Sequence, residues 1–85
     1  MVVFHFTSHL ENGLDIKTAG EFVKEALKCS SKVSIRNGEK HGDAKLIFNV
    51  MSLNIKPGDV VEIAVEGDSE ADDAAMMEQY AAQFL

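Results

Sequence analysis

The chain has 85 residues, 46% of them hydrophobic, and a formal net charge of −6. This length indicates one domain covering residues 1–85, and the single cysteine excludes an intrachain disulfide. The acidic balance argues against nucleic-acid binding, and no apolar run approaches the roughly 20 residues that would insert in a membrane.

The charges are divided unevenly along the chain. All eight Lys and Arg residues fall in residues 1–56, whereas residues 57–85 carry eight acids. A solvated acidic face explains the second part, while the first part can still supply a small cationic contact surface. The amino-terminal residues lack the basic and apolar segments of a signal peptide, so we expect a cytoplasmic protein.

Alternating apolar side chains in residues 2–8 predict a half-buried strand, with His5 facing away from Phe4 and Phe6. A turn at residues 11–13 precedes a helix, for which Asp15 is a suitable N-cap. The helix has a predicted buried stripe at the spacing of one helical face. Its members are Ala19, Phe22, Val23, Ala26 and Leu27.

Residues 32–36 alternate again and are followed by Asn37-Gly38. This dipeptide predicts a hairpin whose return strand is residues 39–43. Residues 44–53 are apolar without alternation and favour a short helix. Residues 61–65 predict a fourth strand, and Ser69 followed by Asp72 resembles a capping box that opens a last helix. The predicted inner stripe of that helix consists of Ala74, Met77, Ala81 and Phe84.

The predicted order of elements is therefore β-α-β-β-α-β-α. Such an order favours an α+β protein, an open-faced two-layer sandwich in which three helices cover one face of a mostly antiparallel four-stranded sheet. Gly20 lies inside the first helix, where it is unfavourable. Either another backbone packs closely against it, or the position is a tolerated defect.

The sequence offers no self-sufficient catalytic machinery. Cys29 lacks an obvious activating base, and the three histidines (His5, His9 and His41) follow no metal-binding spacing. No glycine-rich phosphate loop is present. We expect a non-enzyme without metal or cofactor, in which Cys29 is structural and the histidines lie on the surface.

Two segments resemble the HPr family, the histidine-containing phosphocarriers of the bacterial phosphoenolpyruvate:sugar phosphotransferase system. Residues 12–23 begin Asn-Gly-Leu-Asp-Ile-Lys-Thr-Ala, and the family's active-centre helix begins Asn-Gly-Leu-His-x-Arg-Pro-Ala. Residues 44–53 resemble the family's second functional region. The resemblance extends over essentially the whole chain and implies an HPr-like open-faced sandwich.

The departures from the family pattern bear on function. Asp15 stands at the phosphohistidine position, Lys17 at that of the phosphate-binding arginine, and Thr18 replaces the proline. Leu46 stands where many relatives carry a regulatory serine, so that phosphorylation site is lost. A carboxylate is a weaker nucleophile than imidazole, and lysine lacks the planar fork that grips phosphate.

The resemblance implies a partner-binding surface around the same region. Its candidate members are Ile16, Lys17, Leu46, Ile47, Phe48 and Met51. We expect Ile47, Phe48 and Met51 to be at least partly exposed, and Val50 and Leu53 to belong to the core.

The leading hypothesis is a non-phosphorylatable regulatory or adaptor protein. Its partners would be proteins of the phosphotransferase system or of transcription-regulator type, and the chain itself a monomer or weak dimer. One alternative is a phosphocarrier with a non-standard acceptor, either Asp15 or His9. Others are an HPr-like module in an unrelated partnership, or a relic. Asp15 is either an ordinary helix cap or a permanent mimic of the phosphorylated carrier.

Overall fold

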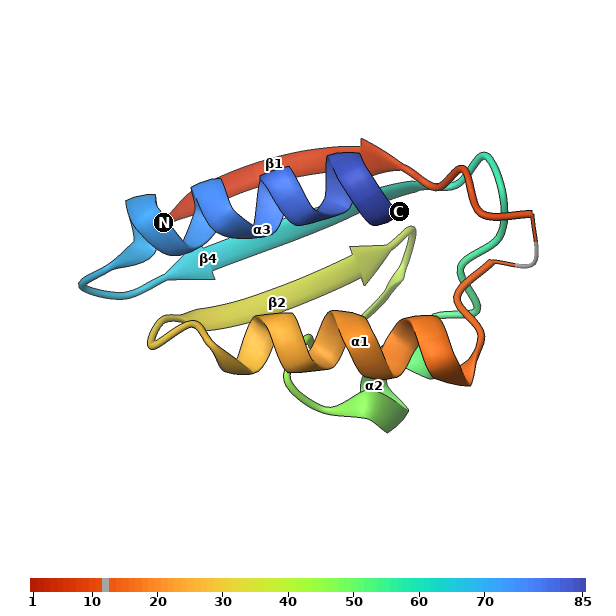
Figure 1. Ribbon diagram of the computed structural model, residues 1–85, viewed down its shortest axis with the longest axis horizontal. Coiled ribbons are helices and arrows are strands. Elements are labelled where there is room, and N and C mark those ends of the chain that lie inside the picture. Colours follow the sequence, from red (N-terminus) through yellow and green to blue (C-terminus); the bar gives the residue numbers. More distant parts are fainter. Residues whose placement is uncertain (12) are drawn as a thin grey trace.

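The computed structural model describes residues 1–11 and 13–85 of the chain. The predicted order β-α-β-β-α-β-α is confirmed (Figure 1). The elements are β1 (Val2–Thr7), α1 (Ile16–Leu27), β2 (Lys32–Asn37), β3 (Lys40–Asp43), α2 (Ile47–Met51), β4 (Val60–Glu66) and α3 (Glu70–Phe84).

The four strands form one sheet in the order β1-β4-β2-β3, and all three neighbouring pairs are antiparallel. Directly opposite residues point to the same face of a sheet. Phe4, Ile63 and Ile35 therefore form one buried row across β1, β4 and β2. The predicted half-buried character of these strands is confirmed.

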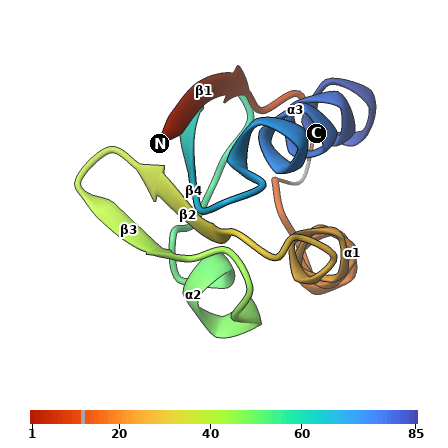
Figure 2. The same ribbon diagram turned by 90° about the vertical axis from the view of Figure 1, so that its left-hand side faces the viewer.

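The core lies between this sheet and the helices, which Figure 2 shows gathered on one side of the strands. Phe22 of α1 and Met77 of α3 are completely buried in it. The other face of the sheet is open and carries polar side chains, such as His5 and Glu62, whose Nε2 and Oε1 atoms lie 3.3 Å apart. This is the predicted two-layer open-faced sandwich.

Two residues of the predicted inner stripes are exposed. Leu27 closes α1 with 59% of its surface accessible, and Cys29, just beyond the helix, occupies the inward position instead. Phe84 is half exposed, and its ring packs on Tyr80 of the same helix, with ring centroids 4.9 Å apart. Leu85 takes the inward position there, four residues after buried Ala81. Both predictions were wrong because the apolar pattern does not show where each helix leaves the core.

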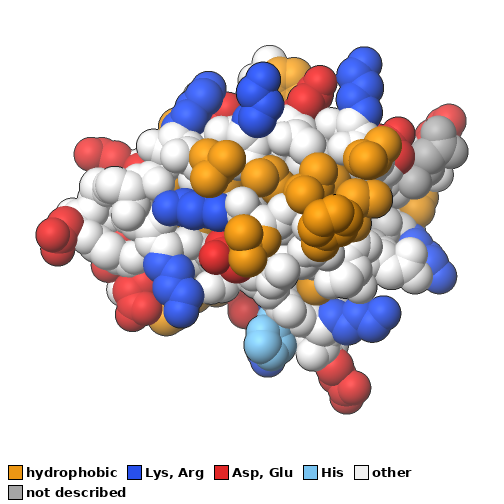
Figure 3. Space-filling view, turned by 90° about the horizontal axis from the view of Figure 1, so that it is seen from below, with side chains coloured by type: hydrophobic (Ala, Val, Ile, Leu, Met, Phe, Trp, Pro, Cys, Tyr) orange, Lys and Arg blue, Asp and Glu red, His pale blue; other side chains and the backbone are white. Residues whose placement is uncertain are grey.

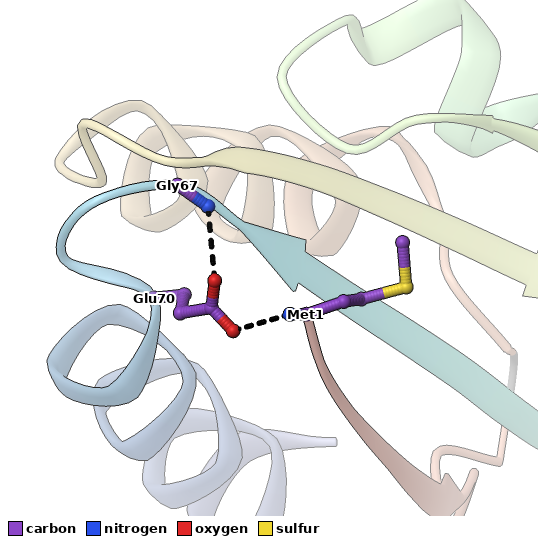
Figure 4. A network of polar contacts seen from close by, with 3 residues as sticks. All are labelled: Met1, Gly67 and Glu70. Carbon is purple, nitrogen blue, oxygen red and sulfur yellow. Dashed lines mark hydrogen bonds and ion pairs between the residues drawn. The ribbon is translucent and has the colours of Figure 1, made fainter.

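Ser69 is the N-cap of α3, so the predicted start of this helix is confirmed, but the predicted capping box with Asp72 does not form among the described residues. Ser69 donates its hydroxyl to the Oδ2 atom of Asp73, at 2.8 Å, and Asp72 is exposed. Glu70 instead accepts the Gly67 N–H, while its second oxygen contacts the amino nitrogen of Met1 (Figure 4). The start of α3 is thus joined to the start of β1.

The helix predicted within residues 44–53 is shorter than the apolar segment. The Ala44 N–H donates to the Val33 carbonyl, and the Lys45 N–H donates to the Asp43 carboxylate at 2.9 Å. These bonds hold residues 44–46 as a turn, so α2 covers only Ile47–Met51. Glu39 likewise belongs to the hairpin turn, and β3 begins at Lys40.

Candidate functional site

The loop before α1 is fixed by Gly13. This residue is buried with φ +66°, a conformation that favours glycine, and its N–H donates to the Leu10 carbonyl. A Cβ at Gly13 would overlap the carbonyl oxygen of Ile55. The absence of a side chain therefore brings the start of α1 close to the chain that follows α2. Asn12, the first residue of the family motif, lies outside the described residues.

Asp15 is the N-cap of α1, as predicted. Its Oδ1 atom accepts the N–H of Thr18 at 2.9 Å, and its own carbonyl accepts the N–H of Ala19. The hydrogen bond from Thr18 lowers the pKa of the Asp15 carboxyl, and the nearby Lys17 charge lowers it further. The carboxylate is consequently charged and already bound to the backbone at neutral pH.

Lys17 is exposed in the first turn of α1, beside Ile16, which exposes 69% of its surface. The tip of this helix thus carries one negative charge, on Asp15, and one positive charge, on Lys17. The Lys17 ammonium is a point charge and lacks the planar bidentate fork of an arginine.

An apolar patch adjoins this helix tip. We define the apolar patch as Ile16 of α1 together with residues of α2 and its N-cap: Leu46, Ile47, Phe48 and Met51. Phe48 exposes 83% of its surface and Leu46 52%, whereas Ile47 is only partly exposed. Figure 3 shows hydrophobic side chains gathered on this face of the molecule, with Lys and Arg side chains around their margin.

The predicted division of α2 between surface and core is confirmed. Val50 and Leu53 are buried, whereas Phe48 and Met51 are exposed. A five-residue helix with one buried face cannot hide its remaining apolar side chains. Contiguous exposed apolar surface of this kind marks interaction sites.

Leu46 occupies the N-cap of α2 in extended backbone geometry. Its side chain forms no cap hydrogen bond within the described part of the chain. A serine hydroxyl at this position would meet the unpaired N–H groups of the first turn. Leu46 therefore leaves α2 without a side-chain cap among the described residues.

Gly20 is where α1 and α2 approach each other. A Cβ built on Gly20 would meet the Cδ1 atom of Ile47 at 3.8 Å, an ordinary van der Waals separation. Close packing therefore does not require glycine here. Of the two alternatives left open by the sequence, the tolerated defect is the one that fits.

The sequence predicts no role for Lys45, but its side chain forms a hydrogen bond in this region. Its Nζ atom donates to the Cys29 carbonyl at 2.8 Å, which connects the start of α2 with the end of α1. A lysine directly before an apolar helix is the only sequence signal for this contact. Which carbonyl it reaches depends on tertiary structure.

The remaining candidate groups do not form a reactive centre. Cys29 is buried, and burial raises the pKa of its thiol, which disfavours the nucleophilic thiolate. His9 is exposed, and its backbone N–H donates to the Leu85 carbonyl. Among the described residues, no group of three metal-ligating side chains occurs and no helix is long and apolar enough to cross a membrane.

Comparison with known proteins gives consistent matches. A family model described as "PTS HPr component phosphorylation site" matches residues 3–83. The phosphocarrier protein HPr of Haemophilus influenzae is 36% identical over 59 residues, 69% of each chain. The HPr-like protein Crh of Halalkalibacterium halodurans is 36% identical over 61 residues, 72% of this chain and 73% of that protein.

A solved structure shares the fold closely. The crystal structure of HPr-C-His from Thermoanaerobacter tengcongensis has a TM-score of 0.90 and 29% identity, over 98% of this chain and 93% of the other. The sequence matches, the family model and the strand order agree with one another. The chain therefore belongs to the HPr family of phosphotransferase-system proteins.

Proposed function

We propose that this chain is a regulatory or adaptor member of the HPr family that does not carry phosphate. The main support for this proposal is the hydrogen bonding of the Asp15 side chain. Its carboxylate stands at the family's phosphohistidine position and accepts the Thr18 N–H as a helix cap. A group engaged in this way stabilises the helix tip and is poorly placed to accept a phosphoryl group.

Chemical differences between the two side chains support the same conclusion. A neutral imidazole nitrogen is nucleophilic near neutral pH and forms a transferable phosphoramidate. A carboxylate acceptor requires neutralisation of the incoming phosphoryl charge, which metal ions provide in known phosphoryl-transfer sites. No cluster of metal-binding carboxylates occurs among the described residues, and Lys17 alone is a weak substitute for one.

The apolar patch supplies the adaptor half of the proposal. Ile16 and Phe48 present apolar surface beside Lys17, so the surface suits a protein partner with an apolar centre and acidic margin. A partner of this kind in the phosphotransferase system or in transcription control would meet the chain in the cytoplasm. The negative charge of Asp15 at the helix tip would then help to determine which partner binds.

Phosphoryl transfer from the general phosphotransferase enzyme tests this directly. We expect the wild-type chain, incubated with that purified enzyme, Mg²⁺ and phosphoenolpyruvate, to keep its unmodified intact mass. The triple variant Asp15→His, Lys17→Arg and Thr18→Pro should gain one phosphoryl group, because the fold that presents these side chains is retained. A phosphorylated wild-type chain would support the alternative of a phosphocarrier with a non-standard acceptor.

The same reaction tests the apolar patch in the reactive background. Adding Phe48→Asp to the triple variant should slow transfer about tenfold or more, as expected for a desolvated aromatic contact. The matched control adds Phe84→Asp, which places the same charge on the half-exposed aromatic residue of α3. Equal slowing by both changes, or by neither, would argue against the patch as the docking surface.

A further inference from the structure

We propose that Lys45 is a positioning residue, whose ammonium group fixes α2 against the end of α1 and so sets the orientation of the apolar patch. The inference rests on the proposed function, because orientation matters only if the patch binds a partner. Lys45 lies outside the apolar patch, and contacts on two sides hold α2 in place.

The first contact joins two helices that are separate in sequence. Lys45 Nζ donates to the Cys29 carbonyl at 2.8 Å. That carbonyl lies just beyond α1, where the unpaired carbonyl groups of a helix terminus concentrate partial negative charge. A charged donor at that position forms a stronger hydrogen bond than a neutral one. The side chain of Lys45 is partly buried, so its ammonium is screened less than those on the open surface.

The Lys45 backbone is fixed as well. Its N–H donates to the Oδ1 atom of Asp43 at 2.9 Å, which closes a tight turn between β3 and α2. With its backbone fixed to β3 and its side chain fixed to the end of α1, Lys45 has little freedom to rotate. Leu46, the next residue, belongs to the apolar patch, and the fixed backbone of Lys45 therefore also restricts the position of Leu46.

A second tether holds α2 from the side of β3. The Oδ1 atom of Asn49 accepts the Asp43 N–H at 3.1 Å. A Cβ at Gly42 would come within 2.8–3.2 Å of the Asn49 side chain, so the glycine leaves the space that this bond requires. Asn49 and Lys45 thus hold the five-residue helix between β3 and α1.

Such tethers are needed because α2 is too short to be stable by itself. Isolated helices below about 12 residues are marginal in water, and this one lacks a side-chain N-cap bond within the described residues. Its buried contact is Val50. Without the Lys45 contact, we expect α2 to open locally more often while the sheet stays folded.

Amide hydrogen exchange in Lys45→Met tests the inference, because methionine keeps the apolar stem and removes the ammonium. The reporters are the N–H groups of Val50, Ser52 and Leu53, which bond carbonyls within the α2 segment. We expect them to exchange about tenfold faster relative to amides of the central strand β4. Lys45→Arg should restore slow exchange, and Lys24→Met, the same change on exposed α1 surface, should leave it unaltered.

Exchange that rises equally in α2 and β4 would show a general loss of stability and would overturn a positioning role. Should Lys45→Met not fold, the wild-type chain supplies the measurement. We expect the Lys45 ammonium protons, observed by nitrogen-15 NMR, to exchange with water more slowly than those of Lys24, and equal rates would reject the tether. Neither experiment uses a partner, so its failure is separate from failure of the proposed function.

Discussion

Asp15 and Leu46 are the N-cap residues of α1 and α2 in this structure. Asp15 forms the cap hydrogen bond to Thr18, whereas Leu46 forms none within the described residues. The tip of α1 therefore has a side-chain cap, whereas α2 begins without one among the described residues.

Replacing Leu46 by serine should therefore stabilise the protein. The backbone of residue 46 already has the extended geometry of an N-cap, and its side chain is half exposed. We expect Leu46→Ser to raise the free energy of unfolding by about 0.5–1 kcal/mol, measured by urea denaturation. Leu46→Ala, which shortens the side chain without adding an acceptor, is the matched control and should not reproduce the gain.

At the scale of elements, α1 and α2 meet through a glycine and an isoleucine. The space beside Gly20 is wide enough for a methyl group, which would contact Ile47 at 3.8 Å. Gly13 differs, because it combines a positive φ with close approach to the Ile55 carbonyl. The same substitution should accordingly have opposite effects at these two positions.

Gly20→Ala should raise the free energy of unfolding by about 0.5–1 kcal/mol, because alanine loses less backbone freedom in a helix. Gly13→Ala should lower it by about 1–3 kcal/mol, through backbone strain and overlap with residue 55. Thermal or urea unfolding of both variants and the wild type measures these two changes in the free energy of unfolding. A destabilised Gly20→Ala would mean that α1 and α2 pack more tightly than the 3.8 Å contact indicates.

For the whole molecule, Asp73 is the carboxylate that joins three parts of the chain. It accepts the N–H of Ser31 at 3.0 Å and the hydroxyl of Ser69 at 2.8 Å, so α3 is bonded to the loop before β2 and to the loop after β4. Hydrogen bonds from Ser31 and Ser69 lower the pKa of Asp73, and the Lys45 charge lowers it further.

A carboxyl with a lowered pKa in the folded state stabilises the fold above its unfolded pKa, and the contribution is lost as pH falls through the folded value. Asp73→Asn should therefore be less stable than the wild type at pH 7, and the difference should shrink below about pH 4. Urea denaturation midpoints of both proteins at pH 7, 5 and 3 measure the difference in stability. Asp72→Asn, an exposed neighbour, is the control. A difference that stays constant with pH would contradict the role given to the ionised carboxylate.

The order of elements and the helix cap at Asp15 can be predicted from the sequence, because apolar periodicity and the preference of aspartate for N-caps act locally. The exposure of Phe48 and Met51 is predicted by the resemblance to the family, and the structure agrees. That residue 15 is an aspartate and residue 46 a leucine is likewise read directly from the sequence.

Which apolar residues leave the core and which polar groups meet depends on the packing of the elements in three dimensions. Leu27 and Phe84 fit a helical stripe, yet both are exposed, whereas Cys29 and Leu85 nearby are buried. Lys45 reaches the Cys29 carbonyl across 16 residues of sequence. The physical reason is that periodicity describes one element at a time, whereas burial and long-range hydrogen bonds depend on how the ends of different elements meet.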